Sequence, residues 1–265
     1  MNHFNKYLSD LPYRLKGLPI VIFILFSNGS LAQRSVRDSA VTPDPLRFSY
    51  KALIIPTVLI GYGTIGIESD QLKLFNTEIR EEVKENIDQQ LTIDDFSQYA
   101  PALSVYGLNA LGIKGKHNFK DRTVILATSY LIMASSVVGL KKITRVERPD
   151  GSSMDSWPSG HTATAFMGAE FLWQEYKDVS IWYGITGYAI AVGTGAFRIY
   201  NDRHWFTDVA AGAGIGILST KIAYWINPFI QEKVFGKKRT ENLSSASLMP
   251  FHSSEGTGLG VVFQF

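Results

Sequence analysis

The sequence predicts an all-α fold, a membrane-embedded bundle of about five to six core helices. Apolar segments of helical length recur along the chain, and only 19% of the residues are charged, fewer than in a typical soluble domain. No internal repeat is visible. The mean hydropathy of +0.02 keeps a soluble or peripheral bundle open as the alternative.

Length and composition exclude several function classes. A chain of 265 residues fits one domain, or one domain with extensions. The net charge of +2 is too balanced to indicate a nucleic-acid partner. The absence of cysteine excludes disulfides, thiol catalysis and zinc bound by thiolates.

The N-terminus has the pattern of an export signal. Cationic residues precede a short apolar core at 18–26, and small residues follow at 30–32. We expect residues 1–32 to be a signal peptide, with a retained membrane anchor as the alternative. Residues 33–48 are polar and are expected to form a linker, so that the following domain begins outside the cytoplasm.

Residues 49–230 are expected to form the helical domain, and its first half has two segments that are apolar enough to span a membrane. These are 52–67 and 123–140. Between them, 69–91 has the spacing of an amphipathic helix, which either covers the core or lies on a membrane surface. The segment 102–113 is apolar but short.

The second half of the domain alternates polar loops with helices. We expect a loop at 141–160, helices at 162–176 and 181–197, a second loop at 198–204 and a last helix at 205–226. Each loop lies between long apolar segments, which makes both loops candidates for a functional site.

The chain is expected to end in a polar tail, residues 231–265. Its last ten residues, GTGLGVVFQF, alternate in the manner of a strand.

The stretch SWPSGHTATAF in the first loop predicts an anion site. Gly160 permits a tight turn, and the helix that follows presents unpaired N–H groups to the turn. Ser159 adds a hydroxyl, and His161 stands at the rim. The alternative is an ordinary loop before a helix.

Three cations and a histidine–carboxylate pair complete the set of candidate residues. Lys141, Arg148 and Arg198 are suited to a tetrahedral dianion such as phosphate. Taken alone, Lys141 and Arg148 could also be basic flanks of a membrane helix, and Arg198 a cation at a helix end. His204 and Asp208 are four residues apart and share a face if a helix has begun. The carboxylate can then hold one ring N–H and leave the other nitrogen as a nucleophile or base.

Taken together, K-x6-R-P, P-S-G-H and R-x5-H-x3-D resemble the signature of the type-2 phosphatidic acid phosphatase and vanadium haloperoxidase superfamily. The resemblance covers residues from about 100 to 226. One departure is Phe197, where the family often has serine directly before the arginine of the third part. The departure removes no charged or catalytic group.

The resemblance implies a role for each matched residue. His204 would attack phosphorus and form a phosphohistidine, Asp208 would orient it, and His161 would protonate the leaving oxygen and then activate water. The phosphate oxygens would be bound by Lys141, Arg148, Ser159, Gly160 and Arg198. Neither a metal nor another cofactor is expected, because three fixed cations replace Mg²⁺.

The resemblance also implies a phosphatase for a phosphate mono- or diphosphate ester, which we expect to be a lipid in the bacterial cell envelope, with the site facing the periplasm. Alternatives are a soluble, non-specific periplasmic acid phosphatase, a vanadate-dependent haloperoxidase and a membrane scaffold without activity. The sequence leaves the substrate and the oligomeric state open.

Overall fold

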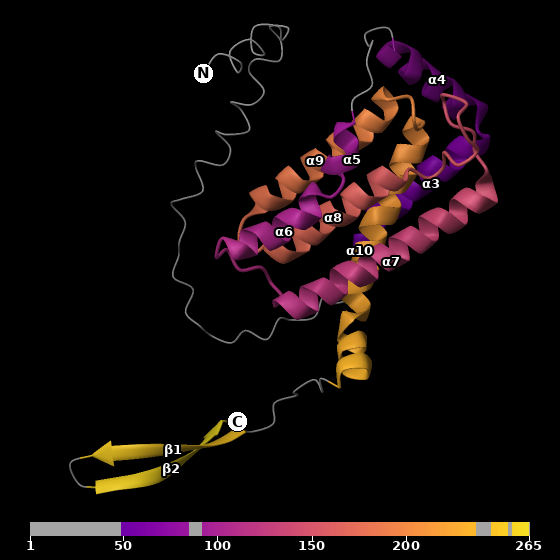
Figure 1. Cartoon of the computed structure of the whole chain (residues 1–265). Coiled ribbons are helices and arrows are strands. Elements are labelled where there is room, and N and C mark those ends of the chain that lie inside the picture. The colour runs from indigo at the N-terminus through magenta and orange to yellow at the C-terminus, as the bar shows by residue number, and fades with distance from the viewer. Residues whose placement is uncertain (1–48, 85–91, 237–244, 254–255, 265) are drawn as a thin grey trace, which may run out of the picture. The chain divides into compact units, whose positions relative to one another are not determined.

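The computed structural model describes residues 49–84, 92–236, 245–253 and 256–264. The expected signal peptide and linker lie outside these residues. Helices make up the described part up to residue 236, and two strands follow (Figure 1). The predicted all-α fold class is confirmed.

The helical part begins with a short 3-10 segment and continues with eight α-helices in the described residues. Most agree with the expected segments, but the five-residue helix near residue 95 was not predicted. The elements are η2 (Tyr50–Leu53), α3 (Ile54–Glu68), α4 (Asp70–Lys84), α5 (Ile93–Ser97), α6 (Ala100–Ala110), α7 (Phe119–Thr144), α8 (Gly160–Tyr176), α9 (Ile181–Tyr200) and α10 (Phe206–Phe235).

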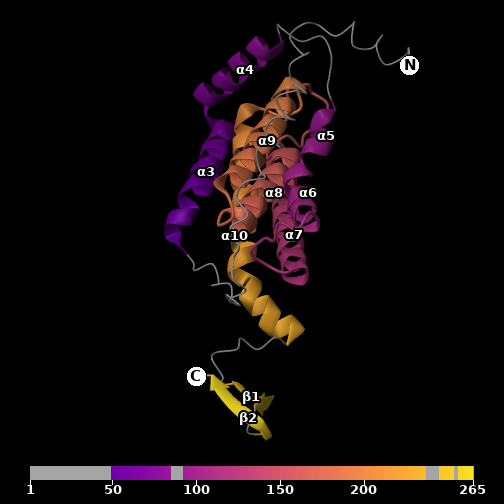
Figure 2. The same cartoon turned by 90° about the vertical axis from the view of Figure 1, so that its left-hand side faces the viewer.

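Helix α8 forms the centre of the bundle. It packs against α6, α7, α9 and α10, and most of its side chains are buried (Figure 2). Small residues let α10 approach it closely: a Cβ on Gly216 would lie 2.3 Å from the carbonyl oxygen of Ala163, and one on Gly212 would lie 2.4 Å from that of Ser159. This close contact fixes the first turn of α8 against α10.

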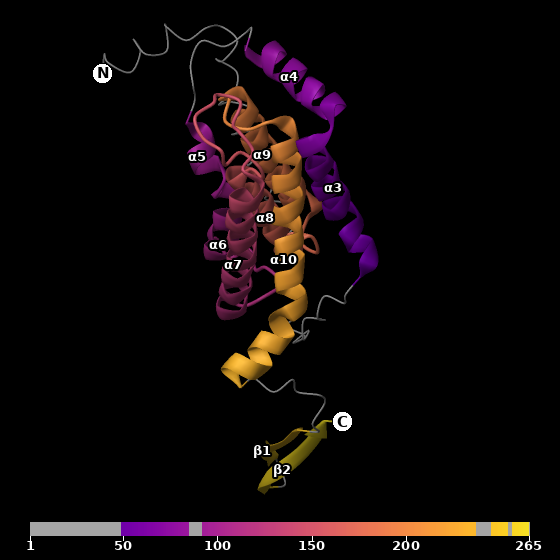
Figure 3. The ribbon, with the colours of Figure 1, turned by 90° about the vertical axis from the view of Figure 1, so that its right-hand side faces the viewer.

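Three helices in the described part are long and apolar enough to cross a membrane. They are Tyr50–Glu68, Phe119–Thr144 and Phe206–Val234. In the apolar 18-residue stretch of each helix, only 17% and 22% of the residues are buried in the first two helices, compared with 67% in the third. Helices α3 and α7 therefore expose apolar surface, whereas the apolar part of α10 is mostly buried. Both α3 and α7 pack against α10, and they lie on either side of it in Figure 3.

Helix α4 is attached to the start of α10 by polar and aromatic contacts. The Asn76 amide donates to the Thr207 hydroxyl at 2.9 Å, and Arg80 makes two hydrogen bonds to Asp202 at 2.6 and 2.9 Å. Phe75 packs edge-on against Phe206, while Leu74 stays 66% exposed. Part of the apolar face of this amphipathic helix is thus left uncovered.

The tail contains a β-hairpin. Strand β2 (Gly256–Gln264) covers the segment with the alternating pattern, and it pairs antiparallel with β1 (Ser245–Ser253), which was not predicted. A lone strand leaves its backbone N–H and C=O groups without partners, so a second strand is physically required. Before the hairpin, α10 continues to Phe235, past the expected domain end at residue 230.

Candidate active site

The motif residues gather at the end of the bundle where α7 and α9 finish and α8 and α10 begin. Lys141 and Arg198 were expected in loops, but they lie in the last turns of α7 and α9. A cation is favourable there because the helix C-terminus carries partial negative charge, and this explains why the helices continue through both residues. Arg148 stays in the loop between α7 and α8.

The pair His204–Asp208 is buried at the start of α10. His204 Nδ1 lies 3.5 Å from Asp208 Oδ2, and both side chains are 2% exposed. Ser156 lies between them, since its hydroxyl donates to Asp208 Oδ2 at 2.5 Å and lies 3.4 Å from His204 Nδ1. Asp208 also accepts the backbone N–H of Trp205 at 2.9 Å. This arrangement engages Nδ1 of His204 and leaves Nε2 for chemistry.

His204 is held in its neutral form. Burial lowers its pKa to about 4, and the charges of Lys141 and Arg198 act in the same direction, while Asp208 opposes the shift. A neutral imidazole keeps the lone pair that a nucleophile needs, so His204 is ready to react at neutral pH.

The Pro-Ser-Gly-His turn is held against α10 by a backbone hydrogen bond. Ser159 is the N-cap of α8, and its backbone N–H donates to the carbonyl oxygen of Asp208 at 3.0 Å. Its hydroxyl lies 2.9 Å from that of Thr162, and the residue is fully buried. The hydroxyl and the backbone N–H of Ser159 are therefore both engaged by groups of the protein. Gly160, the first residue of α8, is half-buried.

Each of the three predicted cations has a partner within the protein. Arg148 makes two hydrogen bonds to Asp155, at 2.8 and 3.2 Å, and this contact lowers the pKa of Asp155 to about 2. Arg198 donates to Asp94 at 2.5 Å. The Lys141 ammonium donates to the backbone carbonyls of Asp155 and Ser156. These contacts fix the positions of the cations before any substrate binds.

A cavity of about 220 Å³ brings Arg148, Arg198 and His161 together, whereas Lys141, Gly160 and His204 are not among its lining residues. His161 Nε2 lies 2.9 Å from Asp95 Oδ1. Burial and the charge of Arg198 lower the pKa of His161, while Asp95 and Asp94 oppose the shift. The lining consists of Thr92, Asp94, Asp95, Arg148, His161, Arg198, Asn201 and Arg203. Its guanidinium groups make it suitable for an anion.

The comparisons with known proteins concern the part of the chain that contains these motifs. Residues 122–232 match the PAP2 superfamily. They belong to the PAP2 superfamily. The matched region contains α8, α9 and the motif residues from Lys141 to Asp208.

One curated relative of the PAP2 domain is a protein named lipid A 1-phosphatase, from Porphyromonas gingivalis. It is 37% identical over 139 residues, which are 52% of this chain and 31% of that protein. The chain thus spans about a third of the length of the relative that it matches.

Two solved structures are similar to the chain. Aquifex aeolicus LpxE shares 25% identity and has a TM-score of 0.43, with 56% of this chain and 94% of that chain covered. A transmembrane PAP2-type phosphatidylglycerolphosphate phosphatase from Bacillus subtilis shares 19% identity and has a TM-score of 0.42, with 71% and 99% covered.

Sequence analysis missed three carboxylate and hydroxyl groups beside the PAP2 motifs. They are Asp94 and Asp95 on α5 and Ser156 in the loop before α8. The only signal for α5 was a pair of acidic residues after Thr92, and nothing in the sequence relates that pair to His161, 66 positions away.

Asp94, Asp95 and His161 together have the side-chain types of a cation site. Ligand atoms of Asp94, Asp95 and His161 lie within 4.8 Å of one another. However, Arg198 already binds Asp94, and Arg148 and Arg203 line the same cavity. Three guanidinium groups oppose the binding of a dication, so the cluster is better suited to orienting protein side chains than to holding a metal.

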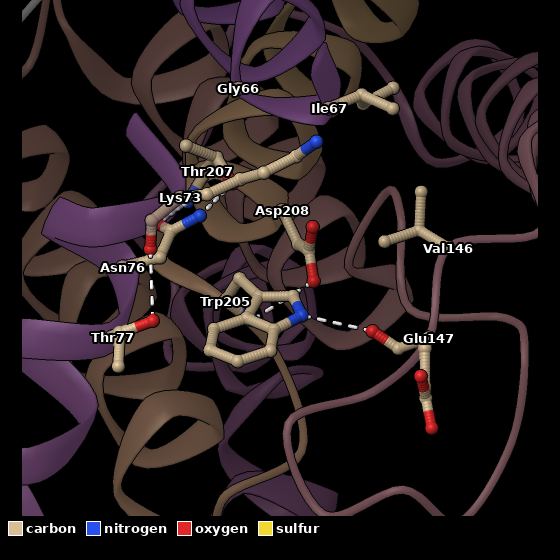
Figure 4. A pocket seen from close by; sticks show the side chains of 10 residues that line it. All are labelled: Gly66, Ile67, Lys73, Asn76, Thr77, Val146, Glu147, Trp205, Thr207 and Asp208. Atoms are coloured by element: carbon tan, nitrogen blue, oxygen red, sulfur yellow. Dashed lines mark hydrogen bonds between the residues drawn. The ribbon is translucent and has the colours of Figure 1, made fainter. Parts of the chain in front are cut away.

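A larger cavity of about 290 Å³ lies on another side of Asp208 (Figure 4). It is lined by residues of α3 and α4 together with Trp205, whose indole N–H donates to the carbonyl oxygen of Glu147 at 2.9 Å. None of Lys141, Arg148, His161 or Arg198 lines it. The smaller cavity is therefore the one that holds Arg148, Arg198 and His161, while Lys141 and His204 line neither cavity.

Proposed function

We propose that the chain is a phosphoric ester hydrolase that removes phosphate from a lipid through a phosphohistidine intermediate. The single observation that carries the proposal is the buried His204 held by Asp208, next in the chain to Arg203, which lines a cavity rich in guanidinium groups. A neutral nucleophile next to fixed positive charge is the arrangement that phosphoryl transfer needs.

In this mechanism, the substrate phosphate enters the smaller cavity. The guanidinium groups of Arg148 and Arg198 bind its non-bridging oxygens, with the Lys141 ammonium and the Gly160 N–H as further donors. Because the protein's own contacts hold these groups in place, they stabilise the charge of the transition state with little reorganisation. Ser159 supports this site by capping α8.

The first chemical step forms a bond between His204 Nε2 and phosphorus while the bond from phosphorus to the ester oxygen breaks. His161 donates a proton to that departing oxygen. Asp208 stabilises the positive charge that the imidazole of His204 acquires. In the second step, His161 removes a proton from water, which attacks phosphorus, releases inorganic phosphate and restores His204.

The lipid nature of the substrate follows from the helices around the site. Apolar surface on α3 and α7 suits a membrane environment, and one residue of the cavity, Arg148, lies in the loop that follows α7, a helix long enough to span a bilayer. The name of the P. gingivalis relative makes lipid A 1-phosphate the first candidate. Phosphatidic acid, phosphatidylglycerol phosphate and undecaprenyl pyrophosphate are the next substrates to compare.

The charge of the connection before α7 supports a proposal for the orientation of the site. The lysine-containing segment 114–118 precedes α7, whereas Lys141 and the active site lie at the other end of that helix. Basic connections tend to remain in the cytoplasm. We therefore place the active site on the periplasmic face of the inner membrane.

The test is phosphate release from a panel of lipid phosphates and an aryl phosphate, with EDTA present throughout. We expect one lipid phosphate to be preferred, activity to survive EDTA and His204→Ala to abolish turnover. His252→Ala, which changes a histidine in the tail hairpin, is the matched control. Loss of activity in EDTA that Mg²⁺ restores would contradict the metal-independent mechanism.

A further inference from the structure

Helix α5 supplies a part of the active site that no motif contains. Its two neighbouring carboxylates contact two different groups of the smaller cavity: Asp94 binds Arg198 at 2.5 Å, and Asp95 binds His161 at 2.9 Å. One short helix thus contacts both a predicted phosphate ligand and the predicted acid and base.

The two carboxylates differ in their surroundings. Asp94 is 1% exposed and also accepts a hydrogen bond from the Asn201 amide at 3.0 Å, as expected for a buried group that holds an arginine in place. The side chain of Asp95 is 53% exposed, and that of His161 is 30% exposed. An exposed ion pair contributes little to stability, so a role in stability alone does not account for this contact.

We propose that Asp95 is a positioning residue for His161, which it holds through Nε2 so that Nδ1 is the nitrogen that exchanges protons with the substrate. The inference rests on the proposed function and deepens it. It gives the domain a second histidine–carboxylate pair: Asp208 orients the nucleophile, and Asp95 orients the acid and base.

The proton balance follows directly. Doubly protonated His161 donates a hydrogen bond from Nε2–H to Asp95 and transfers its Nδ1 proton to the departing ester oxygen. After that transfer, neutral His161 keeps its proton on Nε2, because the Asp95 carboxylate accepts the hydrogen bond from this N–H group. The lone pair of Nδ1 then takes a proton from the water that attacks the phosphohistidine, and His161 is ready for the next turnover.

Charges from three sides act on His161. Helix α9 contributes Arg198, and Arg148 and Arg203 line the same cavity from the two loops, whereas Asp94 and Asp95 face it from α5. The cations disfavour a protonated imidazole, and the carboxylates favour it. Removing the charge of Asp95 therefore lowers the pKa of His161 further and makes its acid form scarcer.

The experiment compares Asp95→Asn with Asp178→Asn, the same change at an exposed residue in the turn between α8 and α9. Each enzyme is assayed on an alkyl phosphate and on an aryl phosphate. We expect Asp95→Asn to lose at least ~10-fold in kcat/KM on the alkyl ester, a part of the 10²–10⁴-fold that an acid or base contributes. Its basic pH limb moves to lower pH, and the aryl ester is affected much less.

A second measurement is independent of turnover. Nitrogen NMR of histidine-labelled protein in detergent, assigned with His161→Gln, reports which ring nitrogen carries the proton. We expect the Nε2–H form of neutral His161 in the wild type and a changed tautomer ratio in Asp95→Asn.

Equal losses on both esters, or kinetics in Asp95→Asn that match the control, would overturn the proposal. So would the Nδ1–H form of His161 in the wild type. These results differ from a failure of the proposed function, in which the wild type itself releases no phosphate while the NMR result still decides the role of Asp95.

Discussion

At the scale of single residues, the two histidines of the site differ in what surrounds them. His204 is buried against Asp208 and Ser156, whereas His161 lies at the rim of the cavity among charged groups. This difference matches their proposed roles, because a nucleophile needs a stable neutral form and an acid needs to gain and lose a proton.

The pH dependence of kcat/KM tests this division of roles. Protonation of His204 stops its attack, so activity on every ester should fall as the pH drops through about 4. His161 must be protonated to act as the acid, and burial lowers its pKa below the usual value. Activity on an alkyl phosphate should therefore decline as the pH rises through that lowered pKa.

An aryl phosphate separates this effect from the ionisation of the substrate. Both esters lose their second phosphate proton near pH ~6, but an aryl alcohol departs readily without a proton. We expect the basic decline to be weaker for the aryl ester. Identical basic limbs for the two esters would show that His161 is not the acid.

The spacing of the motifs predicted which residues lie near one another within each motif, because residues of one motif share a loop or a helix turn. It did not predict their partners. The contact between Asp95 and His161 joins positions 66 apart, and the contact between Asp94 and Arg198 joins positions 104 apart. Only the packing of α5 against α8 and α9 brings them together.

At the scale of elements, long apolar segments were predictable and their ends were less so. Helix α5 has five residues, too few for a helical period to be recognised. Helix α10 was expected to stop at residue 226, yet it continues to Phe235 and contains Pro228, a residue type that usually interrupts helices.

The contact between α8 and α10 can be tested at Gly216. A Cβ there would meet the backbone of Ala163, which cannot move independently of α8, so Gly216→Ala should destabilise the protein by roughly 1–3 kcal/mol. Gly193→Ala is the matched control, because nothing lies within 4 Å of a Cβ at that helical position. Thermal unfolding in detergent should show a lowered Tm for Gly216→Ala only. Equal Tm values for the two variants would contradict the close contact between α8 and α10 at Gly216.

At the scale of the whole molecule, the exposed apolar surfaces of α3 and α7 indicate contact with lipid. Leu131 on α7 is 69% exposed, and Leu111, outside the three candidate spans, is 80% exposed. Lysine in the middle of a membrane-spanning helix costs about 2.5–3.5 kcal/mol on insertion scales. We therefore expect Leu131→Lys, but not Leu111→Lys, to reduce the fraction of protein that stays in membranes after an alkaline wash. Equal retention of both variants would favour a peripheral bundle.

The central claim is that catalysis proceeds through a phosphohistidine at His204, and rapid quench with a labelled aryl phosphate tests it most directly. In His161→Ala, the good leaving group lets phosphorylation proceed, while the base for hydrolysis is missing. We therefore expect acid-labile label to accumulate on this variant and none to appear on His204→Ala. Label on His204→Ala, or no label on His161→Ala and the wild type while phosphate is released, would contradict the account.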